Sequence, residues 1–206
     1  KLQMPTPQEQ LDLLLCANTA VWVAWQVAGK NVNIERWMDK NFVMSYKNMQ
    51  RRPYTLLTSA FSHKSVPHLL SNMQSLLAAA PLVQATIGPQ RFATLYIGGA
   101  VFSALASLAA HRNNGQHQSL GASGAVLAVL ACNAALYPHQ KYAWWGGLEL
   151  NAPQLLLAQV LLDAAAHGVG EQDLQRIDVW GHLGGVVFGF LYHQHIAGPR
   201  TSFIMG

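Results

Sequence analysis

Long uncharged stretches alternate with short charged segments along this chain, and together they define six apolar runs. The runs are Leu13–Gly29, Val66–Gln90, Phe92–Ala110, Gly124–Pro138, Leu150–Ala166 and Val179–Ile196. A helix needs about 20 mainly apolar residues to cross a bilayer. We therefore predict an all-α polytopic membrane protein with six transmembrane helices, over residues 11–29, 66–88, 92–110, 122–138, 150–167 and 180–196.

The segment between the first two runs differs from the rest of the chain. Residues 30–65 are rich in Asn, Lys and Arg and also carry Trp37, Phe42 and Tyr46. Aromatic side chains among mixed charges are typical of the membrane interface. This pattern predicts a long interfacial loop with short amphipathic pieces. Because the sequence contains no linker or internal repeat, residues 1–206 are expected to form one domain.

Composition supports a membrane protein and excludes other classes. Apolar residues make up 51% of the 206 residues and charged residues only 11%, whereas a soluble domain has about 25% charged residues. The net charge of +4 comes from scattered basic residues, so we expect no nucleic-acid partner. Cys16 and Cys132 lie inside apolar runs, which predicts neither a disulfide framework nor a metal site. Residues 1–10 are polar, and we expect no secretory signal peptide there.

Polar side chains at bilayer depth are costly, so each one is a candidate for function. His68 and Asn72 are four residues apart, which places both on one face of the second predicted helix. Their donors could converge on a developing negative charge. The alternative is a polar pair that bonds to a neighbouring helix.

A serine lies between glycines where a loop enters the fourth run, in Gly121-Ala122-Ser123-Gly124. The small neighbours Gly121 and Gly124 would let a substrate carbonyl approach closely, which makes them accessory candidates. The backbone N–H of Ser123, in the first turn of a helix, is a candidate oxyanion donor. Small residues at a helix contact are the alternative explanation.

His182 begins the last run beside a row of glycines. Gly181, Gly185 and Gly189 recur every four residues and predict a bare helix face that another helix backbone can approach closely. If that partner is the helix starting at Ser123, the imidazole of His182 could reach the serine hydroxyl and act as a general base.

Taken together, these motifs resemble the rhomboid family, whose pattern is HxxxN, GxSG and HxxGxxxG in its second, fourth and sixth core helices. All three match here, at His68 to Asn72, Gly121 to Gly124 and His182 to Gly189. The resemblance implies a six-helix rhomboid bundle and an intramembrane serine endopeptidase that cleaves transmembrane proteins with a Ser123–His182 dyad. It also implies that Asn72, His68 and the Ser123 N–H bind the oxyanion, with no cofactor or metal.

Within the family, the chain looks most like the presenilin-associated rhomboid-like proteases of the mitochondrial inner membrane. That likeness rests on Ser62 to Ser65 followed by His68, and on the strings around Ser123 and His182. It implies a multi-pass protein of that membrane, with the lipid bilayer, transmembrane substrates and a larger membrane complex as partners. Leu127 departs from many family members, which carry a Tyr there that packs on the histidine.

Four weaker features have two interpretations each. Asp163 is expected to reach the membrane interface, with water positioning or gating as the alternative. Asp178, an accessory candidate, could tune His182 or cap the last helix. His63 is expected to be structural, and residues 168–181 could form a mobile lid.

Two other functions remain open on the sequence. One is a catalytically inactive rhomboid that serves as a membrane scaffold or complex subunit. The other is a transporter or channel that uses Asp163 and buried histidines as a proton relay.

Overall fold

A computed structural model describes residues 5–144, 147–168 and 178–194, and these residues are mainly helical. The helices are α1 (Pro7–Ala28), α2 (Val32–Phe42), α3 (Tyr46–Arg51), α4 (Thr55–Thr58), a 3-10 turn η1 (Ser59–Phe61), α5 (Val66–Ile87), α6 (Pro89–Ala110), α7 (Ser123–Leu136), α8 (Ala152–Gly168) and α9 (Val179–Tyr192). Two short antiparallel ribbons join β1 (Met44–Ser45) to β2 (Gln118–Ser119) and β3 (Lys141–Ala143) to β4 (Glu149–Asn151).

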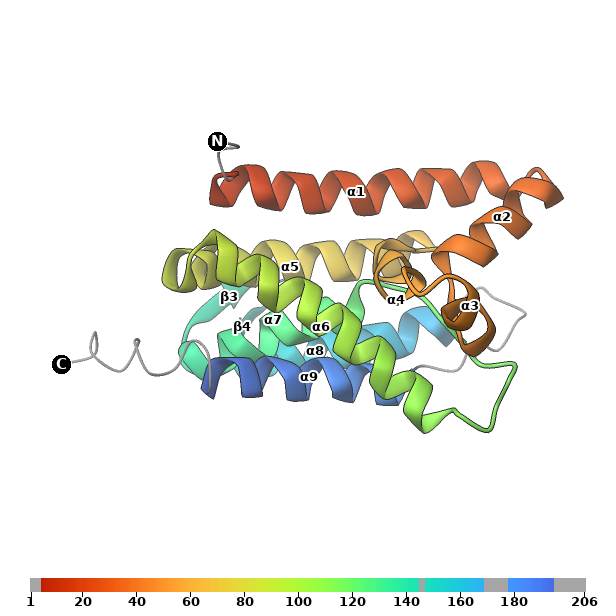
Figure 1. The fold of residues 1–206 in the computed structure, drawn as a ribbon. Helices are drawn as coiled ribbons and strands as arrows, with labels where there is room; N and C mark the ends of the chain where they lie inside the picture. Colours follow the sequence, from red (N-terminus) through yellow and green to blue (C-terminus); the bar gives the residue numbers. More distant parts are fainter. Residues whose placement is uncertain (1–4, 145–146, 169–177, 195–206) are drawn as a thin grey trace.

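The long helices form a bundle around α7 (Figure 1). Every residue of α7 except Ala135 is buried, and its neighbours are α5, α6, α8 and α9. Helix α1 lies on the far side of α5 from this centre and is largely exposed. Because α7 is the most enclosed helix, a polar group at its first residue lies inside protein rather than at the surface.

Local chemistry explains where the helices begin. Thr6 and Glu9 form a reciprocal capping box at α1, so this helix starts earlier than the apolar run indicates. A proline near the first position favours the starts of α1, α5 and α6. Gly88 turns the chain between α5 and α6 with a φ of 80°, a conformation that glycine adopts without strain.

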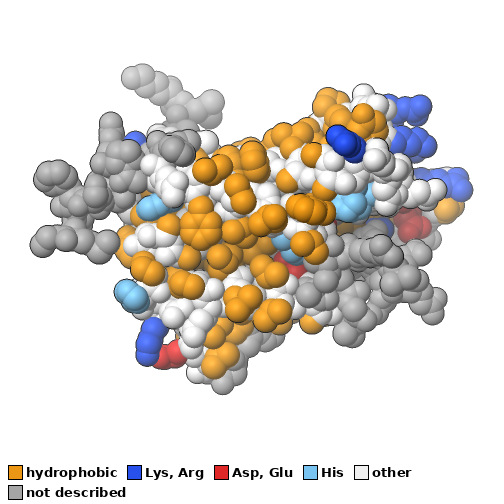
Figure 2. All heavy atoms as spheres, turned by 90° about the horizontal axis from the view of Figure 1, so that it is seen from below, with side chains coloured by type: hydrophobic (Ala, Val, Ile, Leu, Met, Phe, Trp, Pro, Cys, Tyr) orange, Lys and Arg blue, Asp and Glu red, His pale blue; other side chains and the backbone are white. Residues whose placement is uncertain are grey.

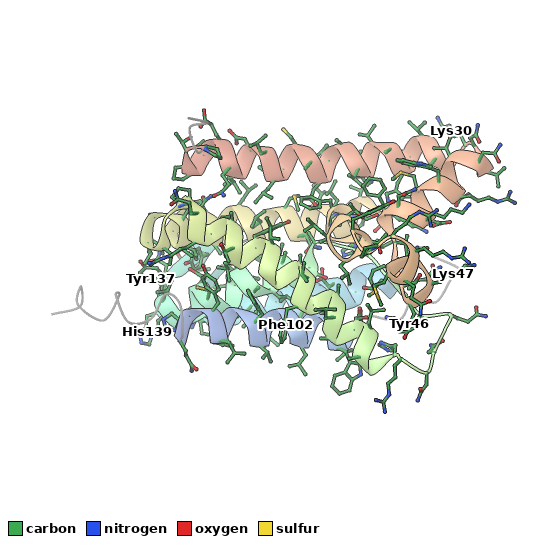
Figure 3. All side chains as sticks on the ribbon, in the orientation of Figure 1. Lys30, Tyr46, Lys47, Phe102, Tyr137 and His139 are labelled. Atoms are coloured by element: carbon green, nitrogen blue, oxygen red, sulfur yellow. The ribbon has the colours of Figure 1, made fainter. Side chains whose placement is uncertain are left out.

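The segment expected to be an interfacial loop contains α2, α3, α4 and η1 at one end of the bundle. Lys30 and Lys47 mark this end, and Tyr137 and His139 mark the opposite end (Figure 3). The β1–β2 pairing, with Met44 opposite Ser119, ties this segment to the loop that precedes α7. The loop between the first two long helices therefore helps to position the candidate serine.

Two of the described helices, α1 and α6, are long and apolar enough to cross a bilayer. Helices α7, α9 and the Ala152–Asp163 part of α8 are apolar but shorter. Helix α5 has 22 residues, but it carries a row of buried polar side chains. The helical class is thus observed, whereas six membrane crossings stay a prediction.

Large apolar side chains cover much of the outer surface. Seen from below, they spread over the middle of the molecule, while Lys and Arg gather toward one end (Figure 2). The exposed apolar residues on the long helices include Leu13, Val27, Leu77, Ile97, Phe102, Leu157, Leu161, Val187 and Phe190. Water would disfavour so much contiguous apolar surface, and lipid would not.

Candidate active site

Ser123 is the first residue of α7, and the two residues before it are held by hydrogen bonds. The Gly121 N–H donates to the Ser59 carbonyl oxygen at 2.9 Å. The Ala122 N–H donates to Nε2 of His63 at 3.3 Å. Because both donors are satisfied from the segment before α5, the turn that presents Ser123 is fixed by contacts distant in sequence.

Gly121 is required at this turn for two reasons. Its φ is 129°, in the region that favours glycine. A Cβ built there would also lie 2.7 Å from Cε1 of His68. His68 therefore packs on the turn two residues before Ser123.

His63 supports the turn as a neutral ring. Burial lowers its pKa from 6.5 to about 3, and a backbone hydrogen bond with Phe61 offsets this only in part. A neutral imidazole has one nitrogen that accepts, and Nε2 accepts from Ala122. This contact agrees with the structural role expected for His63.

His182 lies in the first turn of α9 and reaches Ser123. Its Nε2 is 2.8 Å from Ser123 Oγ. Both residues are buried, with exposed fractions of 6% for His182 and 7% for Ser123. A histidine in this contact can take the hydroxyl proton and leave the oxygen able to attack a carbonyl.

The glycines of α9 set the distance between the two helices. A Cβ at Gly185 would overlap the Gly124 carbonyl oxygen, and one at Gly189 would overlap the Ala128 carbonyl oxygen. These two glycines face α7 as the sequence predicts. Gly181 does not, because its Cβ would meet the Asp178 carboxylate at 2.7 Å.

Two glycines next to this interface face α6. A Cβ on Gly184 would meet Ala106 at 2.6 Å, and one on Gly124 would overlap Ser103. Gly184 lies outside the series of glycines four residues apart, because that series marks only one face of the helix. Both glycines let α6 pack closely beside the serine and histidine.

The α5 residues proposed for the oxyanion are buried beside the dyad. The Asn72 amide nitrogen donates to the His68 carbonyl oxygen at 2.9 Å and to Asp163 Oδ1 at 3.3 Å. The His68 ring packs edge-on against His63 at 4.9 Å. Asn72 is fully buried and His68 is 4% exposed.

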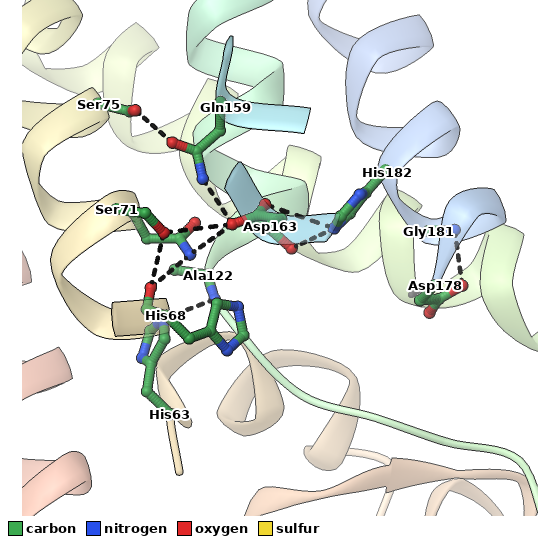
Figure 4. Close-up of polar contacts among 12 residues, drawn as sticks. His63, His68, Ser71, Ser75, Ala122, Gln159, Asp163, Asp178, Gly181 and His182 are labelled. Carbon is green, nitrogen blue, oxygen red and sulfur yellow. Dashed lines mark hydrogen bonds and ion pairs between the residues drawn. The ribbon is translucent and has the colours of Figure 1, made fainter. Parts of the chain in front are cut away.

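Asp163 is not at the membrane interface, so that expectation is wrong. Its side chain is fully buried and turned between α5 and α9 (Figure 4). Its Oδ1 accepts from Gln159 Nε2 at 2.7 Å and from Ser71 Oγ at 3.4 Å, and its Oδ2 lies 3.6 Å from His182 Nε2. An apolar run shows that a helix is membrane-like, but it does not show which way one polar side chain turns.

A sequence signal for this polar cluster did exist. The positions 68, 71, 72 and 75 have the spacing of one helix face, and 159 and 163 have the same relation on α8. The two faces meet, since Ser75 Oγ donates to Gln159 Oε1. Pairing the polar face of α5 with the polar face of α8 would have predicted that Asp163 points into the bundle.

Asp178 caps α9 and fastens it to the loop before α7. Its Oδ1 accepts from the Gly181 N–H at 2.9 Å, which bears out the capping alternative. Burial opposes ionisation of this carboxyl, but hydrogen bonds outweigh the burial and hold its pKa below the usual range. The donors are His117, Ser107, the Gly181 N–H and Ser119.

Three potential metal ligands meet beside this cap, although the sequence predicted none. One ligand atom each of His111, His117 and Asp178 lie within 4.8 Å of one another. His111 Nδ1 donates to the Ser107 carbonyl oxygen at 3.0 Å, and His117 Nε2 lies 2.9 Å from Ser107 Oγ. The hydrogen bonds from His111 and His117 to Ser107, and those to Asp178, hold the loop before α7 against the end of α6 and the start of α9.

A small polar pocket opens beside the serine. It is lined by Ser103, Gln118, Ser119, Leu120, Gly121, Ser123, Gly124, Asp178, Gly181 and His182. Leu127 is fully buried in the hydrophobic core. The proposed lid at residues 168–181 lies mostly outside the described residues, which omit 169–177.

Comparison with known proteins decides the family. Residues 50–198 match the Rhomboid domain family. The chain belongs to the rhomboid family. This confirms the resemblance that the three motifs carry, and it places the serine, the histidine and the polar cluster inside a membrane-protein family.

The relatives of this rhomboid chain include organellar proteins. It is 34% identical to "Rhomboid-like protein 16, chloroplastic" of Arabidopsis thaliana, over 92% of the chain and 63% of that protein. It is 30% identical to "Presenilin-associated rhomboid-like protein A, mitochondrial" of Danio rerio (90% and 47%) and 31% identical to "Rhomboid protein 1, mitochondrial" of Saccharomyces cerevisiae (93% and 54%). The chain thus spans about half to two thirds of these relatives.

Proposed function

We propose that this rhomboid chain is an intramembrane serine endopeptidase with Ser123 as nucleophile and His182 as general base. The observation that carries the proposal is the 2.8 Å contact between His182 Nε2 and Ser123 Oγ. The contact is buried in a bundle whose outer surface is apolar. An activated hydroxyl there suits substrates that are themselves transmembrane proteins.

The geometry supports a two-step acyl transfer. His182 Nε2 accepts the Ser123 proton as Oγ bonds to the carbonyl carbon, and it then gives that proton to the leaving amine as the peptide bond breaks. A water molecule, deprotonated by the same histidine, next attacks the acyl carbon, and the histidine gives that proton to Ser123 Oγ as the ester bond breaks. All of these steps use side chains, backbone donors and water, so no cofactor is required.

Charge on the carbonyl oxygen would be stabilised by the Asn72 amide, His68 and the Ser123 N–H. Asn72 and His68 are buried on α5, and His68 packs on the turn before Ser123. Loss of one oxyanion donor costs about 2.7 to 4 kcal/mol of transition-state stabilisation. Asn72→Ala should therefore lower kcat by at least about 100-fold.

Membrane location and partners follow from the same proposal. Two of the three relatives named above carry "mitochondrial" in their names, which supports a mitochondrial membrane, and the inner membrane is part of the proposal. The exposed apolar faces of α6 and α9 suit lipid or a transmembrane substrate. Association with a larger membrane complex is part of the proposal.

The test is cleavage of a transmembrane substrate by purified protein in liposomes, together with labelling by a fluorophosphonate. Ser123→Ala should abolish both signals, and His182→Ala should abolish labelling while leaving the serine in place. Ser65→Ala is the matched control, because Ser65 precedes α5 and its side chain makes no capping bond. Cleavage that persists in Ser123→Ala would overturn the proposal.

The same assay separates the two other functions. An inactive scaffold would give folded protein with neither label nor cleavage in the unaltered chain. A transporter would give solute or ion flux that depends on Asp163 and not on Ser123. Either result would replace the protease.

A further inference from the structure

We propose that Asp163 is a positioning residue of the active site, because its carboxylate links the Asn72 amide to the His182 imidazole. This inference rests on the proposed function. It assigns a role to α8, a helix that contributes neither the nucleophile, the base nor an oxyanion donor. It also identifies a group that can orient His182 where Leu127 provides no hydroxyl.

The geometry joins three helices at one carboxylate. Oδ1 of Asp163 accepts from Asn72 on α5 at 3.3 Å and from Gln159 on α8 at 2.7 Å. Oδ2 lies 3.6 Å from Nε2 of His182 on α9. The carboxyl is fully buried, so bulk water does not screen it.

The position of Asp163 differs from that of the acid in a Ser-His-Asp triad. In a triad the carboxylate binds Nδ1 and fixes the ring tautomer. Here it lies beside Nε2, the nitrogen that also contacts Ser123 Oγ. Asp163 is therefore placed next to the proton as it leaves the serine.

This placement gives the carboxylate a specific task. When His182 accepts the serine proton, its ring becomes positive and Nε2 carries a hydrogen. A negative Asp163 at 3.6 Å stabilises that ring and offers the N–H an acceptor after Oγ has bonded to the substrate. The imidazolium is then held in place until it donates to the leaving amine.

The contact with Asn72 connects this step to the oxyanion. The Asn72 bond to Asp163 is long at 3.3 Å, whereas its bond to the His68 carbonyl is 2.9 Å. When the carboxylate is drawn to the imidazolium, its two long bonds, from Asn72 at 3.3 Å and from Ser71 at 3.4 Å, are weaker than the 2.7 Å bond from Gln159 and are lost first. The amide hydrogen then becomes available to the substrate oxygen as its charge develops.

The size of the effect follows from Coulomb's law. At about 4 Å and an effective dielectric constant of about 20, one unit charge changes an equilibrium by roughly a thousandfold. Remaining hydrogen bonds and local relaxation reduce this value. We expect removal of the Asp163 charge to slow the chemical step by about 10- to 100-fold.

Asp163→Asn tests the charge, because Asn keeps the shape of Asp and an oxygen acceptor. We expect kcat and the rate of fluorophosphonate labelling to fall by about 10- to 100-fold, with KM changed less than about twofold. The control is Leu161→Val, on the exposed side of the same helix, which leaves Asp163 and its hydrogen-bond partners in place. Its labelling rate should stay within about threefold of the unaltered protein.

The outcomes distinguish this inference from the proposed function. If the unaltered protein neither labels nor cleaves, the protease proposal fails and this inference falls with it. If the unaltered protein is active and Asp163→Asn labels equally fast, only the inference is overturned. A rise in KM with kcat unchanged would also overturn it, because a residue acting on the proton transfer affects kcat.

A measurement on the unaltered protein covers the case in which Asp163→Asn does not fold. Infrared spectra of protein with isotope-labelled aspartate separate ionised from protonated carboxyls. We expect no band from a buried protonated aspartic acid at neutral pH, since Asp163 acts as an anion. Such a band would overturn the inference.

Discussion

Two helix interfaces meet at the candidate active site, and they are built in opposite ways. The α7–α9 interface uses glycine, so that Gly185 and Gly189 touch the backbone of α7 directly. The α5–α8 interface uses polar side chains, so that Ser75 bonds to Gln159 and Asn72 bonds to Asp163. Both interfaces are buried in a bundle with an apolar exterior.

The difference shows that one interface sets the distance between His182 and Ser123, and the other sets the position of the Asp163 charge. Because the glycines of α9 lie directly against the backbone of α7, the distance between the two helices is fixed, and with it the separation of His182 from Ser123. Hydrogen bonds between α5 and α8 leave more freedom in distance but orient donors and a carboxylate. Changes to the two interfaces should therefore have different effects.

The largest expected effect comes from filling the glycine interface. Gly185→Leu puts a side chain where the Gly124 backbone lies, and backbone atoms cannot move aside by rotation as a flexible side chain can. We expect a loss of about 3 kcal/mol in the free energy of unfolding, together with loss of labelling. Unfolding in detergent micelles measures the first. Val187→Leu, on the exposed side of α9, should change stability by less than about 0.5 kcal/mol.

A smaller loss of folding stability should appear on acidification, and it should come from the buried histidine that supports the turn before Ser123. His63 has a folded pKa of about 3 against 6.5, so the unfolded chain binds a proton that the folded chain does not. Its contribution to stability is complete above pH 6.5 and is lost as the pH falls toward 3. The slope from this one proton is at most about 1.4 kcal/mol per pH unit.

Unfolding measured between pH 7 and pH 5 checks this slope. His63→Gln keeps an acceptor for the Ala122 N–H and removes the titration, so its stability should vary less with pH. An equal slope in both proteins would contradict the assignment. Gly185 and Gly189 do not titrate, so these two glycine contacts should contribute nothing to the slope.

The smallest expected effect comes from a single hydrogen bond at the polar interface. Ser75→Ala removes the donor to Gln159 Oε1 and should cost about 1 kcal/mol of stability, because membrane-buried hydrogen bonds are individually modest. The labelling rate should barely change, since Ser75 touches neither Ser123 nor His182. A large loss of labelling with little loss of stability would show that the two interfaces are not separate in function.

Much of the fold could be predicted because apolar runs and their bounding charges are local in the sequence. The helices at Val66–Ile87 and Pro89–Ala110 lie close to the predicted ranges of 66–88 and 92–110. The start of α1 at Pro7 was missed, because a capping box of polar residues extends the helix beyond its apolar part. The number of membrane crossings was not settled by run length, because α7 and α9 have 14 residues each.

The candidate site also contains residues that the sequence predicts and one residue that it misplaces. Ser123, His182, His68 and Asn72 were found because each belongs to a motif with fixed spacing. Asp163 was misplaced because one acid on a helix gives no direction, and only its contacts with Asn72 and His182 show that it turns inward. Its direction could be inferred only by pairing the polar faces of two helices whose contacting residues are 84 and 91 positions apart in the sequence, as in the contacts of Ser75 and Asn72.

The sequence by itself determined the helical class, the family and the motif residues, because periodicity, turn glycines and motif spacing are properties of neighbouring positions. Only the tertiary structure decided that Gly184 faces α6, that Gly181 faces the Asp178 cap, and that Asp163 joins α5 to α9. Those facts depend on how each helix is rotated about its axis. That rotation is fixed by contacts between distant segments.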